Sequence, residues 1–315
     1  MALSVAAVTK GLPREEWLNL RTRGIGGSDA SAVVGLNPWK SKVAVFLEKT
    51  GQSFPDTTGE AAYWGNALED VVAKEFSLRT GLKIQRSHKL YQHPEHRFMI
   101  GNVDRLVTDA QKRKGLLEVK TTTNEKDWED DRIPDHYAIQ LQHYMTVMGL
   151  DYGHFAVLLG GFGGFKFKST YIERDDRISK YLIDMEKQFW YEHVLKKNPP
   201  MIDGSAASTD LLSYLYPTST PDSILQLSSD YEPRVKELRE AEAAKKAAEE
   251  RLEAAKNFIK AAAADAEIIM LNGEKIATWK SHDETRMDTK TFKAEQPEIF
   301  AKYAVTKPVR KFLIK

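Results

Sequence analysis

Two strand-like runs separated by a short polar stretch constrain this chain most, because they predict a β-hairpin. Phe98–Val107 and Gly115–Thr121 are rich in apolar and β-branched residues, and the basic stretch Thr108–Lys114 joins them. If the turn is centred on Gln111, residues equally distant from it face each other. This part of the chain must therefore fold around an antiparallel pair of strands.

This pairing brings two carboxylates together. Asp104 stands opposite Glu118, and the two-residue period of a strand puts Lys120 on the same face as Glu118, with Leu117 and Val119 on the other. Opposed like charges are unfavourable unless something positive lies between them, and a divalent cation fits. Carboxylates that hold Mg²⁺ and a lysine near the attacking water are what a nuclease needs. The competing interpretation is an ordinary solvated, charged face.

A third carboxylate lies on a predicted helix over Gly59–Thr80. Helical spacing places Glu69 on the same inward face as Phe76. A buried carboxylate needs a partner. Two interpretations remain open: a salt bridge with Arg105 or Lys120, or a ligand role at the same metal.

Other helices are indicated by their first residues. Ser28 and Ser41 each precede a short apolar-periodic run and are predicted to be N-caps. Pro134–Met148 is predicted to be a helix in which Gln140 and Tyr144 lie one turn apart beside an apolar stripe. Packing at the helix edge would explain this pair as well as a functional role does.

Composition divides the chain into three regions. Residues 1–197 mix helix and strand patterns and are predicted to form the main α/β domain. Residues 198–230 are rich in Pro, Ser, Thr and Asp, which is typical of a linker or surface-wrapping segment and not of a periodic element. Residues 231–315 are predicted to form a C-terminal helical arm and a small α+β tail. Further strands of the main domain are expected at Lys83–Tyr91, His154–Leu159 and Phe165–Glu173, before a helix at Asp175–Lys197.

The C-terminal region begins with a long helix. Glu232–Ala264 is almost entirely Ala, Glu, Lys, Arg and Leu, and its apolar residues form one narrow, alanine-rich seam. A hairpin around Asn272-Gly273, a helix at Thr289–Tyr303 and a last strand at Val309–Ile314 are expected to follow.

The overall composition excludes several classes of protein. Hydrophobic residues make up 42% of the 315, and 46 Lys and Arg balance 45 Asp and Glu, which is typical of a globular protein. The chain has no cysteine, so disulfides, thiolate metal sites and iron–sulfur clusters are excluded. No apolar run approaches the ~18 residues of a membrane helix, and a cytoplasmic location is expected.

Four ordered motifs point to a known family. The motifs are Trp17–Arg21 followed by Gly26–Ala30; Trp64-Gly65 followed by Leu68-Glu69; Asn102–Asp104 followed by Glu118–Lys120; and Gln140–Met145. The third resembles the core of PD-(D/E)xK nucleases, and all four together resemble the lambda exonuclease and YqaJ group of viral recombination exonucleases. The resemblance implies a restriction-endonuclease-like core with a mixed central sheet flanked by helices.

The resemblance also implies roles for individual residues. Asp104, Glu118 and the carbonyl of Val119 would hold Mg²⁺, for which Mn²⁺ would substitute, and Glu69 would support a second metal or its water. Lys120 would activate water, and Gln140 would line the site. Arg21, Ser28 and Lys126 would hold the 5′-phosphate of the DNA end. Val103 replaces the proline of the family motif, and Asn102 replaces a serine that contributes to phosphate binding.

The implied function is that of a metal-dependent deoxyribonuclease. It would degrade duplex DNA from 5′ to 3′, leave 3′ single-stranded overhangs, and act with a single-strand annealing protein of the RecT/Bet type as a homotrimeric ring. The alternatives are a structure-specific or CRISPR-adaptation-type nuclease with the same core, and a DNA-binding recombination scaffold with an idle site. The complete Asp104, Glu118 and Lys120 set argues against an idle site.

Overall fold

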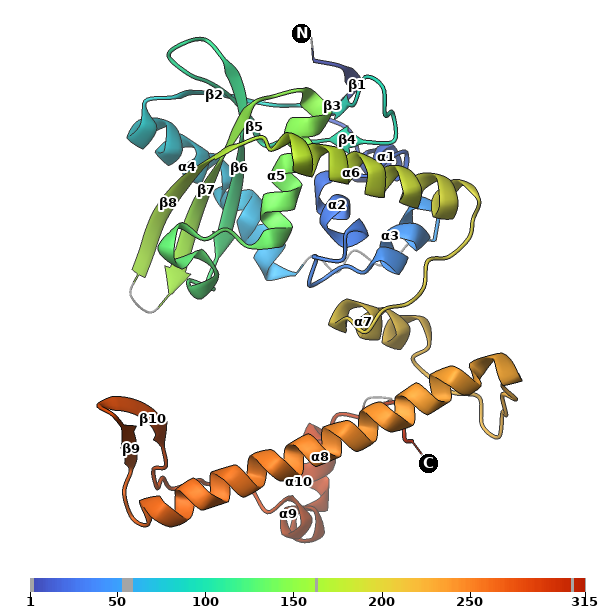
Figure 1. Ribbon diagram of the computed structural model, residues 1–315, viewed down its shortest axis with the longest axis vertical. Coiled ribbons are helices and arrows are strands. Elements are labelled where there is room, and N and C mark those ends of the chain that lie inside the picture. Colours follow the sequence, from blue (N-terminus) through green and yellow to red (C-terminus); the bar gives the residue numbers. More distant parts are fainter. Residues whose placement is uncertain (1–2, 53–58, 162–163, 307–308, 315) are drawn as a thin grey trace. The chain divides into compact units, whose positions relative to one another are not determined.

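A mixed five-stranded sheet lies at the centre of the N-terminal part of the protein (Figure 1). The computed structural model describes residues 3–52, 59–161, 164–306 and 309–314. The chain divides into two units, Met1–Leu215 and Tyr216–Lys315. The sheet belongs to the first unit and has the order β2-β5-β6-β7-β8, in which only β6 and β7 run parallel. Its strands are β2 Lys83–Arg86, β5 Arg105–Thr108, β6 Lys114–Thr122, β7 Tyr152–Gly161 and β8 Gly164–Glu173.

The hairpin register predicted from sequence is confirmed. Arg105 pairs with Leu117 and Thr108 pairs with Lys114, so the turn is centred on Gln111. The turn between the two strands includes Lys112, whose φ of 63° lies in the left-handed region. Asp104 directly precedes β5, one position beyond the last hydrogen-bonded pair.

Two helices cover opposite faces of this sheet. Phe76 of α4 (Glu60–Thr80) packs with Leu117 and Val119, whereas α5 (Asp135–Met148) packs with Leu116. Alternate residues of β6 therefore face different helices, as a strand buried on both faces requires. Glu118 and Lys120 consequently face α5.

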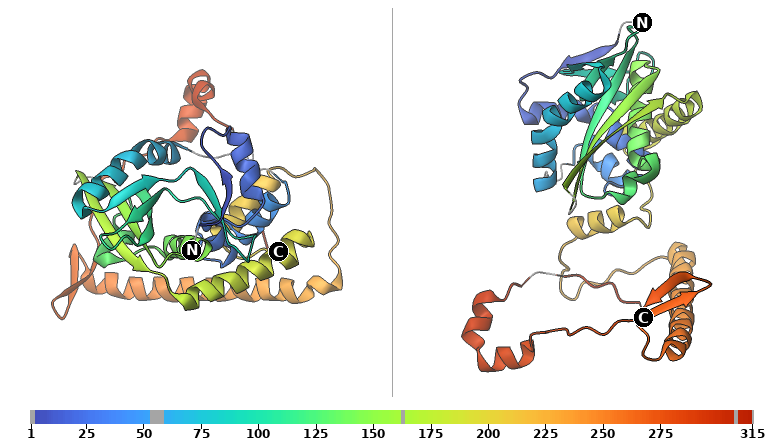
Figure 2. Two further views of the ribbon diagram at one scale, coloured as in Figure 1. Left: turned by 90° about the horizontal axis from the view of Figure 1, so that it is seen from above. Right: turned by 90° about the vertical axis from the view of Figure 1, so that its left-hand side faces the viewer.

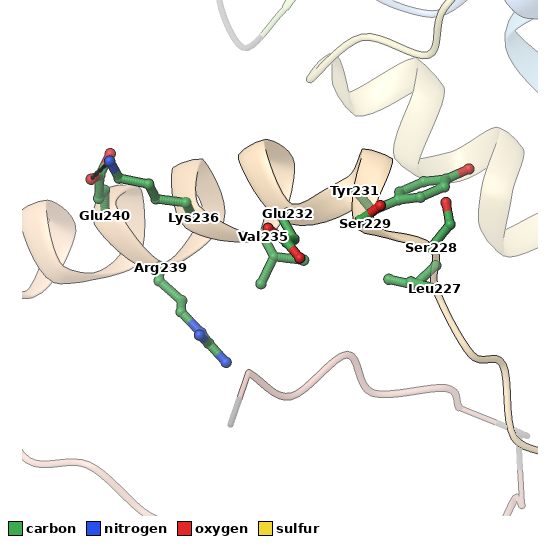
Figure 3. A pocket seen from close by; sticks show the side chains of 9 residues that line it. All are labelled: Leu227, Ser228, Ser229, Tyr231, Glu232, Val235, Lys236, Arg239 and Glu240. Atoms are coloured by element: carbon green, nitrogen blue, oxygen red, sulfur yellow. Dashed lines mark ion pairs between the residues drawn. The ribbon is translucent and has the colours of Figure 1, made fainter.

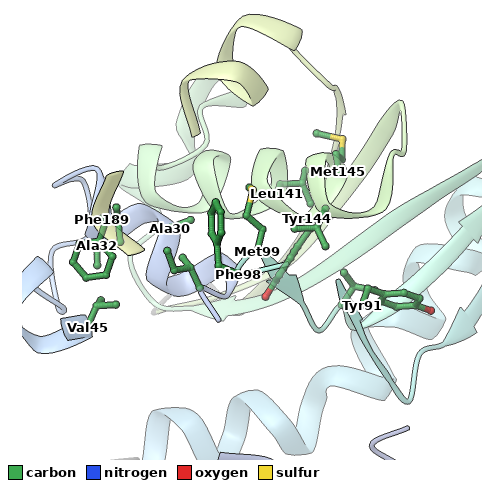
Figure 4. Packing of buried hydrophobic residues seen from close by; sticks show 14 of the residues in the cluster. Ala30, Ala32, Val45, Tyr91, Phe98, Met99, Leu141, Tyr144, Met145 and Phe189 are labelled. Carbon is green, nitrogen blue, oxygen red and sulfur yellow. The ribbon is translucent and has the colours of Figure 1, made fainter. Parts of the chain in front are cut away.

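Most of the remaining helices gather around α5 into one apolar core (Figure 4). Ala30, Leu141, Met145 and Phe189 belong to it and come from three separate helices. The helices are α1 Arg14–Thr22, α2 Gly27–Val33, α3 Lys42–Lys49, α6 Asp176–Phe189, continued by a π-helical turn at Trp190–Leu195, and α7 Ala206–Leu215. A second sheet in the order β1-β3-β4 lies beside α5. Its strands are β1 Val5–Val8, β3 Lys89–Gln92 and β4 Ile100–Gly101.

Four sequence expectations about elements of the first unit need correction. Lys83–Tyr91 is not one strand, because β2 and β3 belong to different sheets, and Phe98–Val107 divides in the same way into β4 and β5. Ser28 is not an N-cap: α2 begins at Gly27, and the Gly26 N–H donates to Asp29 instead. The segment 198–230 contains a periodic element, α7, whose Leu211 is buried in the main core.

The second unit is built around one long helix, α8, at Glu232–Ala263 (Figure 2). The hairpin predicted at Asn272-Gly273 is confirmed. The helix expected at Thr289–Tyr303 is two helices, because the chain is non-helical at Gln296 before Pro297, and Val309–Ile314 is not a strand. The other elements are a 3₁₀ turn at Ser229–Tyr231, β9 Ile268–Leu271, β10 Glu274–Thr278, α9 Thr289–Glu295 and α10 Pro297–Tyr303.

The apolar seam of α8 is exposed in this unit. None of the helix's residues is buried, and Leu252 is more than half exposed. A surface pocket lies where the helix begins (Figure 3), with Leu227, Tyr231, Val235 and Arg239 among its lining residues.

Candidate active site

The two carboxylates of the hairpin meet beside α5. The Val119 N–H donates to Asp104 Oδ2 at 2.8 Å, which ties the residue before β5 to the backbone of β6. Glu118 Oε1 accepts from Lys120 Nζ at 3.0 Å and from Gln140 Nε2 at 2.7 Å. The structure thus brings Asp104, Glu118, Lys120 and Gln140 together at one point between a strand and a helix.

Burial controls the ionisation of this cluster. Burial, with the charge of Asp104 as a second cause, raises the pKa of Glu118 to about 8. Burial also raises the pKa of Asp104. For Lys120 burial acts in the opposite direction, but attraction to Glu118 and Asp104 outweighs it and raises the pKa. Without a further cation, burial therefore favours the protonated form of both carboxyls.

The donor set suits a hard divalent cation. Glu118 Oε2 is buried and has no hydrogen-bond partner among the described residues, which leaves a carboxylate oxygen free to act as a ligand. Mg²⁺ is commonly bound by one or two carboxylates and completes its shell with water. In the part of the chain that the structure describes, no three His, Asp or Glu side chains gather as a ready-made metal site, so Asp104 and Glu118 would need the Val119 carbonyl or water to complete one.

Glu69 is engaged by arginine instead. Arg105 Nη1 donates to Glu69 Oε1 at 2.6 Å, and the same guanidinium contacts Asp70. Arg86 Nη2 lies 3.6 Å from the same oxygen, Glu69 Oε1. The salt-bridge interpretation of Glu69 therefore describes its contacts, and its charge acts on the site from a distance by raising the pKa values of Asp104 and Glu118.

A close helix contact connects this cluster to α2. Tyr144 OH lies 3.3 Å from Gln140 Nε2, and its ring packs against Gly27. A Cβ at Gly27 would lie 2.6 Å from Tyr144 Cζ and 2.9 Å from Gln140 Cγ, so only glycine allows this approach.

The first turn of α2 carries a candidate anion site. Arg21 Nη2 donates to Ser28 Oγ at 3.1 Å, and the Arg21 guanidinium lies over the Trp17 ring. Beneath them Asp29 is fully buried. Burial alone would raise the pKa of Asp29, but Lys40 and Lys49, each 2.7 Å away, hold it well below its usual value.

Lys126 lies outside the elements that carry the two clusters. It is exposed on a 3₁₀ turn at Lys126–Asp131. A contact with DNA remains its predicted role.

Comparison with known proteins places the chain. Residues 16–151 match the YqaJ-like viral recombinase domain. The protein YqaJ of Bacillus subtilis is 38% identical over 316 residues, covering 99% of this chain and 97% of that protein. The chain belongs to the YqaJ family. A protein of Acanthamoeba polyphaga mimivirus is 26% identical over 149 residues, which cover 44% of this chain and 27% of that protein.

Solved structures similar to this YqaJ-family protein include two from bacteria. An alkaline exonuclease from Laribacter hongkongensis superposes with a TM-score of 0.49 and 19% identity, covering 58% of this chain and 94% of that one. A phage-related exonuclease from Haemophilus somnus gives a TM-score of 0.43 and 14% identity, covering 57% of this chain and 99% of that one. Within the described residues, no helix is both long and apolar enough to cross a membrane.

Some side chains of the candidate site in this YqaJ-family protein were not predicted from sequence. Tyr137 lies under Lys120, with 4.9 Å between Nζ and the ring centroid. Its spacing, four residues before Leu141, predicts only a place in the apolar stripe of this helix. Lys49 is fully buried, donates to the Arg21 carbonyl at 2.8 Å and pairs with Asp29. A lysine in the last turn of a helix is ordinary, and no sequence signal distinguishes this one.

Proposed function

We propose that this protein is a Mg²⁺-dependent exonuclease that degrades one strand of duplex DNA from 5′ to 3′ and leaves 3′ single-stranded overhangs for recombination. One observation carries the proposal: Glu118 has a buried, unpartnered oxygen beside Asp104 and Lys120. A chain gains nothing in stability from burying opposed carboxylates, whereas a metal-dependent hydrolase requires them. The matching domain is described as a viral recombinase, which makes recombination the biological setting of the proposal.

The residues around the hairpin would divide the work. Asp104, Glu118 and the Val119 carbonyl would hold Mg²⁺, which when bound polarises the phosphate and lowers the pKa of the attacking water. Gln140 fixes Glu118 through its amide N–H. Lys120, held between Glu118 and the Tyr137 ring, would orient the water and offset charge on the phosphate. Glu69 would act indirectly or hold the water of a second metal.

The pair Arg21 and Ser28 would bind the 5′-phosphate of the shortened strand. A guanidinium fork recognises phosphate oxygens in pairs, and the buried Asp29 below keeps it in place. Lys126 would add a contact to the DNA backbone. We further propose that Mn²⁺ replaces Mg²⁺, that the protein works as a ring-shaped homotrimer around DNA, and that it delivers its product to an annealing protein of the RecT/Bet type.

Digestion of linear duplexes tests this proposal. Each strand is labelled separately, and ends with a 5′-phosphate or a 5′-hydroxyl are compared with Mg²⁺, with Mn²⁺ and with a chelator. We expect metal-dependent loss of the 5′-ended strand, faster from phosphorylated ends, and no loss with Glu118→Gln. Cleavage only at branched or flapped DNA would instead identify a structure-specific nuclease. Tight DNA binding without cleavage in either metal would identify an idle scaffold.

A further inference from the structure

Trp39 is an exposed ring on a firmly held loop. Trp39 as a whole residue is 68% exposed to solvent. The residues on either side are anchored: Asn37 Oδ1 accepts from the N–H groups of Trp39 and Lys40 at 2.9 Å, and Lys40 Nζ pairs with the buried Asp29. Exposing a tryptophan costs hydrophobic free energy, and fixing its loop does not recover that cost.

The loop is attached to the candidate phosphate site. The amide group of Asn37 donates to the Ser28 carbonyl at 3.2 Å and to Ser31 Oγ at 3.0 Å. Trp39 therefore has a fixed position relative to the first turn of α2, where Arg21 and Ser28 meet.

On its other side, Trp39 is connected by aromatic rings to the proposed hydrolytic cluster, which consists of Asp104, Glu118, Lys120 and Gln140. It contacts His136 edge-to-face, with 4.7 Å between ring centroids, and lies 6.3 Å from Tyr137. Tyr137 in turn lies under Lys120. Tyr137 therefore connects Trp39 to Lys120, the proposed catalytic lysine. Asn37 connects Trp39 to Ser28 of the proposed phosphate site.

The ring beneath Trp39 also has an unused polar atom. His136 Nε2 is buried and has no hydrogen-bond partner among the described residues. Buried polar atoms are rarely left without a partner. An exposed aromatic face with a polar atom at its base suits a flat ligand with polar edges.

From these observations we propose that Trp39, supported by His136, is a stacking platform for an unpaired base of the DNA strand that lies between the phosphate site and the hydrolytic cluster. This inference rests on the proposed nuclease function. A base fits better than an apolar side chain of a protein partner, because candidate phosphate-binding groups lie on both sides of the ring. Aromatic stacking accepts any of the four bases, so it suits an enzyme that digests DNA of any sequence.

Abasic nucleotides test the platform directly. A series of duplexes carries one abasic nucleotide at each of the first four positions of the digested strand. We expect Trp39→Ala to lower kcat/KM about tenfold on intact DNA, the size of losing one stacked base. At one position, the abasic substrate should slow the unmodified protein by a similar factor and leave no further loss for Trp39→Ala. Trp39→Phe should recover most of the rate.

The matched control is Tyr181→Ala, which removes another half-exposed aromatic ring from α6 of the same unit. It should digest every substrate normally. Unaltered digestion by Trp39→Ala, or an equal loss on intact and abasic DNA at all four positions, would overturn the platform.

A second measurement separates this inference from the function on which it rests. Anisotropy of labelled oligothymidine is recorded without divalent cations, where no cleavage occurs. If the unmodified protein fails to digest DNA but binds oligothymidine about tenfold more tightly than Trp39→Ala does, the platform stands and the nuclease proposal falls. If digestion is normal and Trp39→Ala binds as tightly as the unmodified protein, only the platform falls.

Discussion

Glu118 shows how a single buried carboxyl links pH, metal and stability. Its folded pKa of about 8 lies above the value of about 4.3 for an unfolded glutamate. The unfolded chain therefore releases this proton first as pH rises, and the metal-free protein loses stability between about pH 4.5 and 8. Glu118→Gln removes this loss. In buffer that contains a chelator, we expect Glu118→Gln to have a higher Tm than the unmodified protein at pH 8.5. At pH 4.5 the two proteins should have similar Tm values.

Adding Mg²⁺ at pH 8.5 supplies the control for this prediction. It should raise the Tm of the unmodified protein and leave that of Glu118→Gln nearly unchanged, since a cation that binds only the folded site stabilises it. An equal increase in Tm with Mg²⁺ in both proteins would show that the metal does not bind at this hairpin.

Lys120 is expected to separate catalysis from binding. Lys120→Ala removes the ammonium group that we propose acts on the water and the phosphate, but keeps Asp104 and Glu118, the proposed metal ligands. Cleavage should fall by about two to four orders of magnitude, as for loss of a general acid–base group. The Tm increase with Mg²⁺ and the affinity for duplex DNA, measured by anisotropy, should persist. Loss of the Mg²⁺ response would show that Lys120 is needed to build the metal site.

Arg21 is expected to determine the preference for phosphorylated ends. Losing a charge-assisted hydrogen bond costs about 1.5–3 kcal/mol, so Arg21→Ala should reduce the rate advantage of a 5′-phosphate over a 5′-hydroxyl at least tenfold. Strand-labelled digestion of both ends measures the ratio. Equal rates on both ends by the unmodified protein would already contradict the assignment.

At the residue scale, the sequence predicted contacts within one hairpin better than contacts between segments distant in sequence. The hairpin register followed from symmetry about Gln111, and with it the meeting of Asp104, Glu118 and Lys120. The contact of Gln140 with Glu118 depends on where α5 crosses the sheet, which spacing along either segment cannot specify. Glu69 was predicted to need a partner, but only the fold selects Arg105 over Lys120.

Among the elements, α5 is fastened to its neighbours by a buried ion pair. His143 Nδ1 lies 2.8 Å from Glu186 of α6, and its Nε2 lies 2.9 Å from the Ile100 carbonyl of β4. A carbonyl only accepts, so Nε2 carries a proton and the other nitrogen shares one with the carboxylate. Burial opposes the charged ring, but Glu186 outweighs it and raises the pKa of His143.

Removing one partner of this pair is expected to destabilise the first unit strongly. His143→Phe leaves Glu186 buried without its partner, which typically costs about 3–5 kcal/mol. Urea unfolding followed by circular dichroism measures the loss. The double variant His143→Phe/Glu186→Met should recover part of it, because it leaves no unpaired charge. A double variant no more stable than the single one would show that the unpaired Glu186 charge is not the cause of the loss.

Several element boundaries depended on contacts that the sequence does not display. The continuous pattern of Lys83–Tyr91 gives no sign that β2 and β3 join different sheets. Leu211 makes α7 a helix of the main core, although Pro, Ser and Thr around it are typical of a linker. Pro297, by contrast, marks the break between α9 and α10 in the sequence itself, because the residue before a proline disfavours the helical conformation.

For the whole molecule, the position of α7 predicts where the chain can be cut. A fragment ending at Leu215 keeps every buried residue of α7, whereas one ending at Lys197 removes Leu211 from the core. Burying one leucine contributes about 1.5–3 kcal/mol, so the shorter fragment should unfold at lower urea concentration or precipitate.

The longer fragment should be soluble and should digest short duplexes with Mg²⁺. Its mass in solution then shows whether residues 216–315 are needed for oligomerisation. If the fragment ending at Leu215 precipitates while the full chain does not, the C-terminal unit contributes to the fold of the first.

The missing side chain at Gly27 has a mechanical consequence for the proposed exonuclease. The Tyr144 and Gln140 side chains lie against the backbone at Gly27, so no side chain separates the proposed phosphate-binding turn from the helix that carries Gln140. This contact would fix the distance between a bound 5′-phosphate and the proposed metal site, and with it the length of each product. A methyl group at residue 27 would increase that distance without altering any proposed catalytic group.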